Sequence, residues 1–144
     1  MDEKSRIDQL FDSILTALGE ELYAIIVFQR NKKIFPQKVQ SGVEDTIKEE
    51  ISKVLDSGML LHIINSGMKE FGTLAYKAIK IGVILGEIGE ESILVLITAP
   101  GANSSFFFPY VFLVAEKIQR IMLNRQTSLV IPKFERPEDQ TTLL

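Results

Sequence analysis

The stretch Ser92-Ile-Leu-Val-Leu-Ile-Thr98 decides the fold of this chain, because every residue between its two polar ends is apolar. A strand with this pattern has no side that suits water, so it lies inside a sheet whose two faces are both covered. Gly89-Glu90-Glu91 before the stretch is typical of a turn, and Ala99–Asn103 after it is typical of a loop. The sequence therefore predicts a central strand over 92–98 in a layered domain.

Two more strand-like runs lie directly before this turn, at Thr73–Lys80 and Gly82–Ile88. Short connections between consecutive strands favour antiparallel neighbours, so the three runs predict a β-meander. An earlier pair of apolar runs, Leu22–Phe28 and Ile34-Phe35, flanks a short polar segment and predicts a hairpin. Because Pro36 cannot donate a ladder hydrogen bond, the second strand of this hairpin is expected to be short or to lie at a sheet edge.

Two helices are expected at the ends of the domain. Apolar residues recur three and four positions apart over residues 3–18, and a glycine follows where a helix commonly ends. A helix over about 106–124 is predicted after the loop, with Ser104 or Ser105 as its N-cap. Pro109 lies near the expected first turn, where its missing N–H group removes no hydrogen bond. The first helix would bury Ile7, Leu10, Phe11, Ile14, Leu15 and Leu18.

A further helix is predicted to begin near residue 43, after Ser41-Gly42, and to continue through Gly58 to about residue 66. A glycine inside a helix costs ~1 kcal/mol, which a well-packed helix tolerates. The alternative is that the helix ends at Gly58 and that Met59–Ile64 forms a strand. One face of the continuous helix would be the stripe of Val43, Ile47, Ile51, Val54, Leu55 and Leu61.

The second half of this helix is apolar all round. With the stripe against the sheet, four apolar side chains would project from the other side, those of Met59, Leu60, Ile63 and Ile64. An uncovered apolar patch is an aggregation liability, so another surface is expected to cover it. In a domain of this size the simplest cover is a second copy of the chain. The alternative is that the other helices or the C-terminal tail cover the patch.

The composition limits the class of protein. The chain has 144 residues, enough for one domain, which we expect over residues 1–125 with an extended tail over 126–144. Its net charge is −3 and no run of Lys or Arg forms a basic stripe, so nucleic acid is not an expected partner. It has no cysteine, no basic-then-apolar secretory signal and no apolar stretch near the ~20 residues that span a bilayer. A cytoplasmic protein without a transmembrane segment is expected.

Candidate catalytic and metal-binding residues are few. His62 is the only histidine, and its spacing selects no nucleophile or orienting acid, so we interpret it as a partly buried packing residue. The acidic residues Glu87, Glu90 and Glu91 cluster at a turn without calcium-loop spacing and are expected in solvent. The glycines of residues 82–89 lie within strand-like residues, so they predict bends and turns rather than a phosphate loop. We expect no catalytic activity, no bound metal ion and no cofactor.

The order helix, two strands, helix, three strands, helix over residues 3–124 resembles that of the roadblock family of dynein light chains and GTPase regulators. The most family-like pieces are the helix Ile7-Asp-Gln-Leu-Phe11 leading into Ala24-Ile-Ile-Val-Phe28, and the strand 92–98 with its following loop and helix. The resemblance implies an α+β fold of order α-β-β-α-β-β-β-α. Its five-stranded antiparallel sheet would carry the second helix on one face and the first and third helices on the other.

The same resemblance implies how the protein works. Roadblock proteins dimerise by pairing the second helix and the third strand, which places Leu74 and Tyr76 at a dimer edge beside Met59, Leu60, Ile63 and Ile64. The function would be that of a homodimeric or heterodimeric platform that binds a Ras-like small GTPase, or a motor or membrane-associated complex, without a catalytic arginine. The bulky Phe106-Phe-Phe108 followed by Pro109, and the tail from Gln126, depart from the family pattern.

Other classes of protein predict different observations. A longin or profilin-like adaptor in trafficking or the cytoskeleton shares a related build but not the dimer through the second helix. A small-ligand sensor would need an internal cavity with a few convergent polar groups, which the apolar strands do not offer. A small hydrolase would need a pocket that holds His62 beside an acid with a perturbed pKa.

Overall fold

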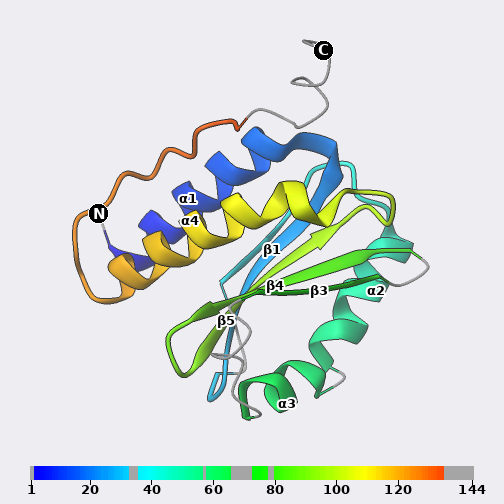
Figure 1. Cartoon of the computed structure of the whole chain (residues 1–144), viewed down its shortest axis with the longest axis horizontal. Coiled ribbons are helices and arrows are strands. Elements are labelled where there is room, and N and C mark those ends of the chain that lie inside the picture. The colour runs from blue at the N-terminus through cyan, green and yellow to red at the C-terminus, as the bar shows by residue number, and fades with distance from the viewer. Residues whose placement is uncertain (1, 33–35, 57, 66–72, 78–79, 135–144) are drawn as a thin grey trace.

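The fold is an antiparallel sheet with two helices on each face (Figure 1). The computed structural model describes residues 2–32, 36–56, 58–65, 73–77 and 80–134. In chain order the elements are α1 (Glu3–Leu18), a 3-10 turn (Gly19–Glu21), β1 (Leu22–Gln29), β2 (Gln37–Val39), α2 (Asp45–Asp56), α3 (Met59–Asn65), β3 (Thr73–Lys77), β4 (Gly82–Ile88), β5 (Ser92–Thr98) and α4 (Ser104–Met122).

The sheet has the strand order β2-β1-β5-β4-β3, and each pair of neighbours is antiparallel. The prediction that strand 92–98 is central is confirmed, since β5 lies between β1 and β4 and all of its residues are buried. Successive side chains of a strand point to opposite faces. Leu94 and Leu96 therefore pack under α1 and α4, whereas Ile93, Val95 and Ile97 belong to the core on the side of α2 and α3.

The helix α1 begins and ends at the predicted residues. The carboxylate of Asp2 accepts a hydrogen bond from the Ser5 backbone N–H at 2.8 Å, which caps the first turn. Gly19, with a φ of 62°, follows the last residue, Leu18, in a conformation that favours glycine. Along the helix the six predicted apolar side chains are buried, namely Ile7, Leu10, Phe11, Ile14, Leu15 and Leu18.

The helix α4 begins earlier than predicted, which changes its cap and the place of its proline. Asn103 is the N-cap, and its Oδ1 accepts from the Ser105 N–H at 3.1 Å, so the prediction of a serine cap is wrong. Pro109 consequently lies inside the helix and not in its first turn. It is tolerated there because it lies on the exposed side, where water can satisfy the carbonyl that loses its partner.

The hairpin differs from the prediction in its second strand. Ile34-Phe35 lies outside the described residues, and β2 follows Pro36 instead of preceding it. The Pro36 carbonyl still accepts from the Val27 N–H at 2.8 Å, so the proline uses the one ladder group that it has. As expected from that proline, β2 is short and lies at an edge of the sheet.

The predicted long second helix is two helices, which is a correction. Gly58 has a φ of 77°, a left-handed conformation that ends a helix instead of continuing it. The helix α2 therefore stops at Asp56, and α3 starts at Met59 in a new direction (Figure 1). The alternative of a strand over Met59–Ile64 is wrong, because these residues are helical. In the described part of the chain, no helix is long and apolar enough to cross a membrane.

Candidate protein-binding surface

The helix α2 presents opposite characters to the sheet and to solvent. Its apolar side packs on the sheet through Ile47, Ile51, Val54 and Leu55, of which Ile51 is the most buried. Its outer side carries charged residues in short-range ion pairs, Lys48 with Asp45 at 3.9 Å and Lys53 with Glu50 at 3.2 Å. Exposed pairs at this spacing suit a helix face that stays in water. The outer face of α2 is therefore not an apolar binding surface.

The helix α3 has a different phase from the one predicted. Leu60, expected on the outer side, is 1% exposed and belongs to the core, whereas Leu61, expected against the sheet, is 39% exposed. The exchange follows from the break at Gly58, because α3 is a separate helix whose rotation about its own axis is not set by α2. The outward orientation predicted for Leu60 is wrong, and Leu61 takes its place.

The other apolar residues of α3 are incompletely covered. Met59, Ile63 and Ile64 are half-buried, and Ile63 and Ile64 pack against the core at its border. We call the incompletely covered apolar side chains of this helix, which flank the buried Leu60 on both sides, the α3 ridge: Met59, Leu61, Ile63 and Ile64. Large apolar side chains grouped in this way mark an interaction site more often than single exposed ones do.

The edge strand β3 shares a side of the sheet with α3. Leu74 pairs in register with Leu85, and Tyr76 pairs with Val83. Leu85 and Val83 lie in the core on the side of α2 and α3. The register therefore assigns positions 74 and 76 to the same side as the α3 ridge. Among the described residues, no strand pairs with the outer edge of β3.

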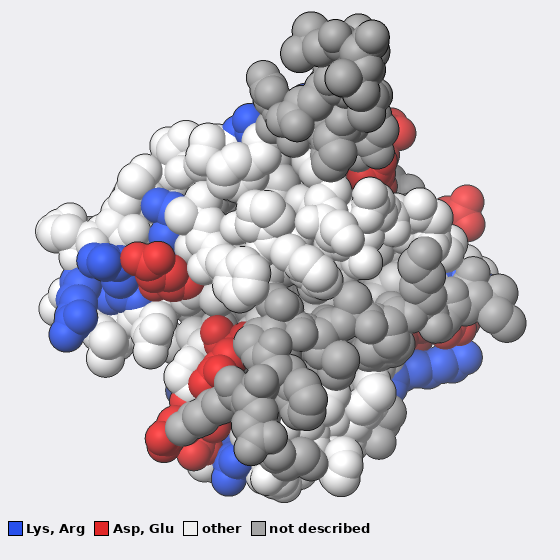
Figure 2. Space-filling model, viewed as in Figure 1, with Lys and Arg blue, Asp and Glu red and all other residues white. Residues whose placement is uncertain are grey.

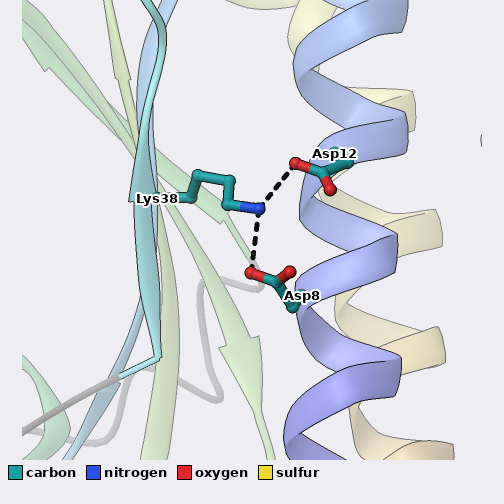
Figure 3. A network of polar contacts seen from close by, with 3 residues as sticks. All are labelled: Asp8, Asp12 and Lys38. Carbon is teal, nitrogen blue, oxygen red and sulfur yellow. Dashed lines mark hydrogen bonds and ion pairs between the residues drawn. The ribbon is translucent and has the colours of Figure 1, made fainter.

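The opposite edge of the sheet is protected by charge. Lys38 of β2 contacts two carboxylates of α1, with Nζ at 2.6 Å from Asp12 and 2.8 Å from Asp8 (Figure 3). The hydrogen bonds to Asp12 and then Asp8 raise the pKa of the Lys38 amine above its ordinary value. A short edge strand with a proline and a charged lysine is a poor template for another strand. Of the two edges, β3 is therefore the one suited to pairing.

The candidate catalytic and metal-binding residues do not assemble into a site. His62 is exposed on α3, so the prediction that it is partly buried is wrong. At the turn between β4 and β5, Glu91 forms an ion pair with Arg30 at 3.2 Å. Within the described residues, no three His, Cys, Asp or Glu side chains lie together in a way that could hold a metal ion.

A second surface, on the side of α1 and α4, was not predicted. Phe112 of α4 is 58% exposed, and the surface over the first half of α4 shows no charged group in the view of Figure 2. The bulk of the segment 106–108 is explained by burial, since Phe106 and Phe107 pack edge to face with ring centroids 5.7 Å apart. Phe112 lies one helical turn after Phe108 and points away from the rings of Phe106 and Phe107. The 3.6-residue period of the helix could have indicated this outward orientation from the sequence.

These features define an α+β protein with one antiparallel sheet between two pairs of helices and, in the part of the chain that the structure describes, with one sheet edge suited to pairing, that of β3. No protein-family model and no curated protein matches the sequence. The structure is similar to the gliding protein MglB from Thermus thermophilus, with a TM-score of 0.57 and 16% identity over 85% of this chain and 92% of that one. It is also similar to MglB in a tetrameric arrangement, with a TM-score of 0.59 and 17% identity over 85% and 91% of the two chains.

A third similar structure is a Roadblock/LC7 domain from Streptomyces avermitilis, with a TM-score of 0.52 and 8% identity over 85% of this chain and 99% of that domain. At these identities the likeness concerns the fold. The chain has a roadblock-family fold, as the order of its elements indicated.

Proposed function

We propose that this chain is a non-enzymatic, cytoplasmic platform that self-associates and binds a Ras-like small GTPase. In this proposal residues 1–125 form the platform, and the residues from 126 onward are an extended tail whose first part, up to residue 134, packs on α1 and α4. The observation that carries the proposal is the α3 ridge, a group of incompletely covered apolar side chains on the same side of the sheet as the open edge of β3. Two binding elements on one side suit a single partner surface.

A second copy of the chain is the partner that fits both elements. Two β3 edges can pair about a two-fold axis and continue the sheet, because antiparallel pairing is symmetric. The proposed interface comprises Met59, Leu61, Ile63 and Ile64 of α3 with positions Leu74 and Tyr76 of β3. Leu60 stabilises the chain itself and has no direct contact in this interface. The tetrameric arrangement of one similar MglB structure supports self-association.

The GTPase partner is inferred from the fold. The roadblock family contains GTPase regulators, and the described residues hold no metal cluster that would favour chemistry of the chain's own. A platform acts by holding the GTPase's own catalytic groups in position, so the proposal requires a binding surface and no nucleophile. Purified Ras-like GTPases of the source organism, loaded with GDP or a non-hydrolysable GTP analogue, are the probes. Binding that depends on the nucleotide is the expected result.

Self-association is tested by molar mass in solution across a dilution series, for the native chain, Leu61→Glu and Phe112→Glu. Burying a whole leucine side chain is worth about 1.5–3 kcal/mol. Burying the 39% of Leu61 that is exposed, once in each copy, is therefore worth roughly 1–2 kcal/mol. Because a glutamate there also buries an unpaired charge, we expect Leu61→Glu to raise the dimer dissociation constant at least about tenfold.

Phe112→Glu is the matched control, since it replaces an exposed apolar side chain on the other side of the sheet. We expect its dissociation constant to equal that of the native chain. An equal loss in both variants would reject the α3 ridge as the interface. A native chain that stays monomeric at all concentrations would reject the dimer and favour a longin or profilin-like adaptor.

A further inference from the structure

The chain doubles back after α4 and lies along the two helices of that face. Asn124, with a φ of 55°, reverses the direction, and the Arg125 N–H donates to the Arg120 carbonyl at 2.8 Å. Residues 125–134 then run beside α1 and α4 without regular secondary structure (Figure 1, orange). We call this segment the strap, and the place that it occupies between α1 and α4 the strap groove.

The strap is held by three apolar side chains. Ile131 is 5% exposed and belongs to the core, Leu129 and Phe134 are half-buried against it, and Val130, between Leu129 and Ile131, is 69% exposed. Burial alternates from residue 127 to Ile131, as in an extended chain that packs through one side, and Phe134 follows three residues later. The Phe134 ring packs edge to face on Tyr110 of α4, with centroids 4.8 Å apart.

Four side chains of the helices bind main-chain atoms of the strap, the first being Arg6 of α1, whose Nη2 donates to the Arg125 carbonyl at 2.6 Å. The Ser13 Oγ of α1 accepts from the Ile131 N–H at 2.7 Å, and the Tyr110 hydroxyl accepts from the Phe134 N–H at 2.8 Å. The Lys117 Nζ donates to the Ser128 carbonyl at 2.7 Å. Every sequence has main-chain groups, so these side chains could bind any segment with the same extended backbone. Selectivity for one sequence would then come from the spacing of its apolar side chains, as in Leu129, Ile131 and Phe134.

The charge of Lys117 is poorly matched by the strap. This lysine is 9% exposed, yet its hydrogen-bond acceptor is a neutral carbonyl, and no acidic side chain of the described residues forms an ion pair with it. A buried ammonium group is held more strongly by a carboxylate than by a neutral oxygen. Space is also left between α1 and the strap, in a shallow open depression of about 500 Å³ lined by Asp12, Ser13, Thr16, Ala17, Val130, Ile131 and Lys133.

We propose that the strap groove is a binding site for an extended segment of a partner protein, which the strap occupies until that segment displaces it. The segment carries three apolar side chains at the spacing of Leu129, Ile131 and Phe134, and a carboxylate near the position of Ser128 that pairs with Lys117. Displacement is feasible because only Ile131 of the strap is fully buried, and because a partner segment in the same extended conformation can form the same main-chain hydrogen bonds. The groove lies on the face of the sheet opposite the α3 ridge.

The test uses the full-length chain with the strap weakened. Ile131→Glu places a charge in the core and releases the strap, whereas Val130→Glu changes its exposed neighbour and is the control. The probe is a fluorescent peptide of residues 126–134, and its binding is followed by fluorescence anisotropy. We expect the peptide to bind Ile131→Glu at least about tenfold more tightly than the native chain or Val130→Glu, because a tethered strap competes at an effective concentration on the order of millimolar.

Two further variants test the groove itself. In the Ile131→Glu chain, Lys117→Met is expected to weaken peptide binding severalfold. A peptide with Ser128→Asp is expected to bind more tightly than the unmodified peptide, and salt should reduce this gain, since it comes from an ion pair. An aspartate that gives no gain, or a gain that persists in Lys117→Met, would overturn the role of Lys117.

Hydrogen exchange of the strap amides separates the outcomes. A strap that is released in Ile131→Glu without any gain in peptide binding would overturn the proposal, because the empty groove would then accept nothing. A strap as protected as in the native chain would overturn it too, since Ile131 would not be the anchor. If Ile131→Glu fails to fold by circular dichroism, Ile131→Ala gives the same comparison with a smaller expected gain of severalfold. No gain with that variant refutes the proposal.

Discussion

Gly86 lets α4 lie directly on the sheet, and adding one methyl group there tests this packing. A Cβ at this position of β4 would lie 2.3 Å from the Cγ1 atom of Val111. Carbon atoms that are not bonded do not approach so closely, so α4 or the valine must move. Val111 is 1% exposed and β-branched, which leaves it few other rotamers. Gly86→Ala is therefore expected to overpack the contact between α4 and β4.

The expected loss of stability follows from two opposing terms. Overpacking a well-filled core costs about 1–3 kcal/mol. Replacing glycine by alanine in a strand recovers about 0.5–1 kcal/mol, because the unfolded chain loses conformational freedom. We expect a net loss of about 1–2 kcal/mol in the free energy of unfolding. The same displacement would shift Tyr110 and Lys117 on α4, so hydrogen-exchange protection of the strap should fall as well.

Urea denaturation of single and double variants measures this contact. Val111→Ala alone should cost about 1–3 kcal/mol through the cavity that it leaves. In the double variant the new methyl of Gly86→Ala occupies part of that cavity. The loss of stability in the double variant should therefore be at least about 1 kcal/mol smaller than the sum of the losses in the two single variants. Gly101→Ala is the control, since no atom lies within 4 Å of its added Cβ. Additive losses, or an unchanged stability in Gly86→Ala, would refute the close contact.

Two further predictions concern elements that position the binding surfaces. Lys38→Met should lower the free energy of unfolding by about 1 kcal/mol at neutral pH, as expected for partly exposed ion pairs. Because the pKa of Lys38 is raised in the folded chain, its contribution is complete below the ordinary value of 10.5 and disappears as the pH rises through the raised pKa. If the native chain and Lys38→Met still differed in their free energy of unfolding in strong alkali, the stabilising role of the Lys38 charge would be contradicted. Leu60→Ala should cost about 2–5 kcal/mol in thermal or urea unfolding, since this side chain is 1% exposed. A loss below about 1 kcal/mol would show that Leu60 is not a core residue.

The parts of the fold that the sequence predicted are those in which local pattern and tertiary burial agree. Strand 92–98 is apolar throughout and is buried throughout, and the apolar period of residues 3–18 matches α1 residue for residue. The helix pattern over 43–66 agreed with the structure only in part. A glycine is compatible with both continuation and termination of a helix, and Gly58 terminates it. Once the helix is broken, the phase of Leu60 and Leu61 depends on packing and not on the residues before the break.

The strap groove could not be predicted from local patterns. Ser13 and Ile131 are brought together by the tertiary fold, and serine and tyrosine hydroxyls are too common to indicate a partner. One signal was present in the sequence: Lys117 falls within the apolar period of α4, between Val114 and Ile118. A charged residue in a buried helical stripe requires a partner from another element. The Ser128 carbonyl, eleven residues further along the chain, supplies it.

The two proposed binding surfaces lie on opposite faces of one sheet, so they can be perturbed separately. The α3 ridge lies on the side of the sheet that α2 covers, and the strap groove lies on the side that α1 and α4 cover. Substitutions that share no partner usually have additive effects. Leu61→Glu should therefore leave peptide binding unchanged, and Ile131→Glu should leave the dimer dissociation constant unchanged. If each variant altered both readouts, the sheet would couple the two faces, and release of the strap would be a means of controlling self-association.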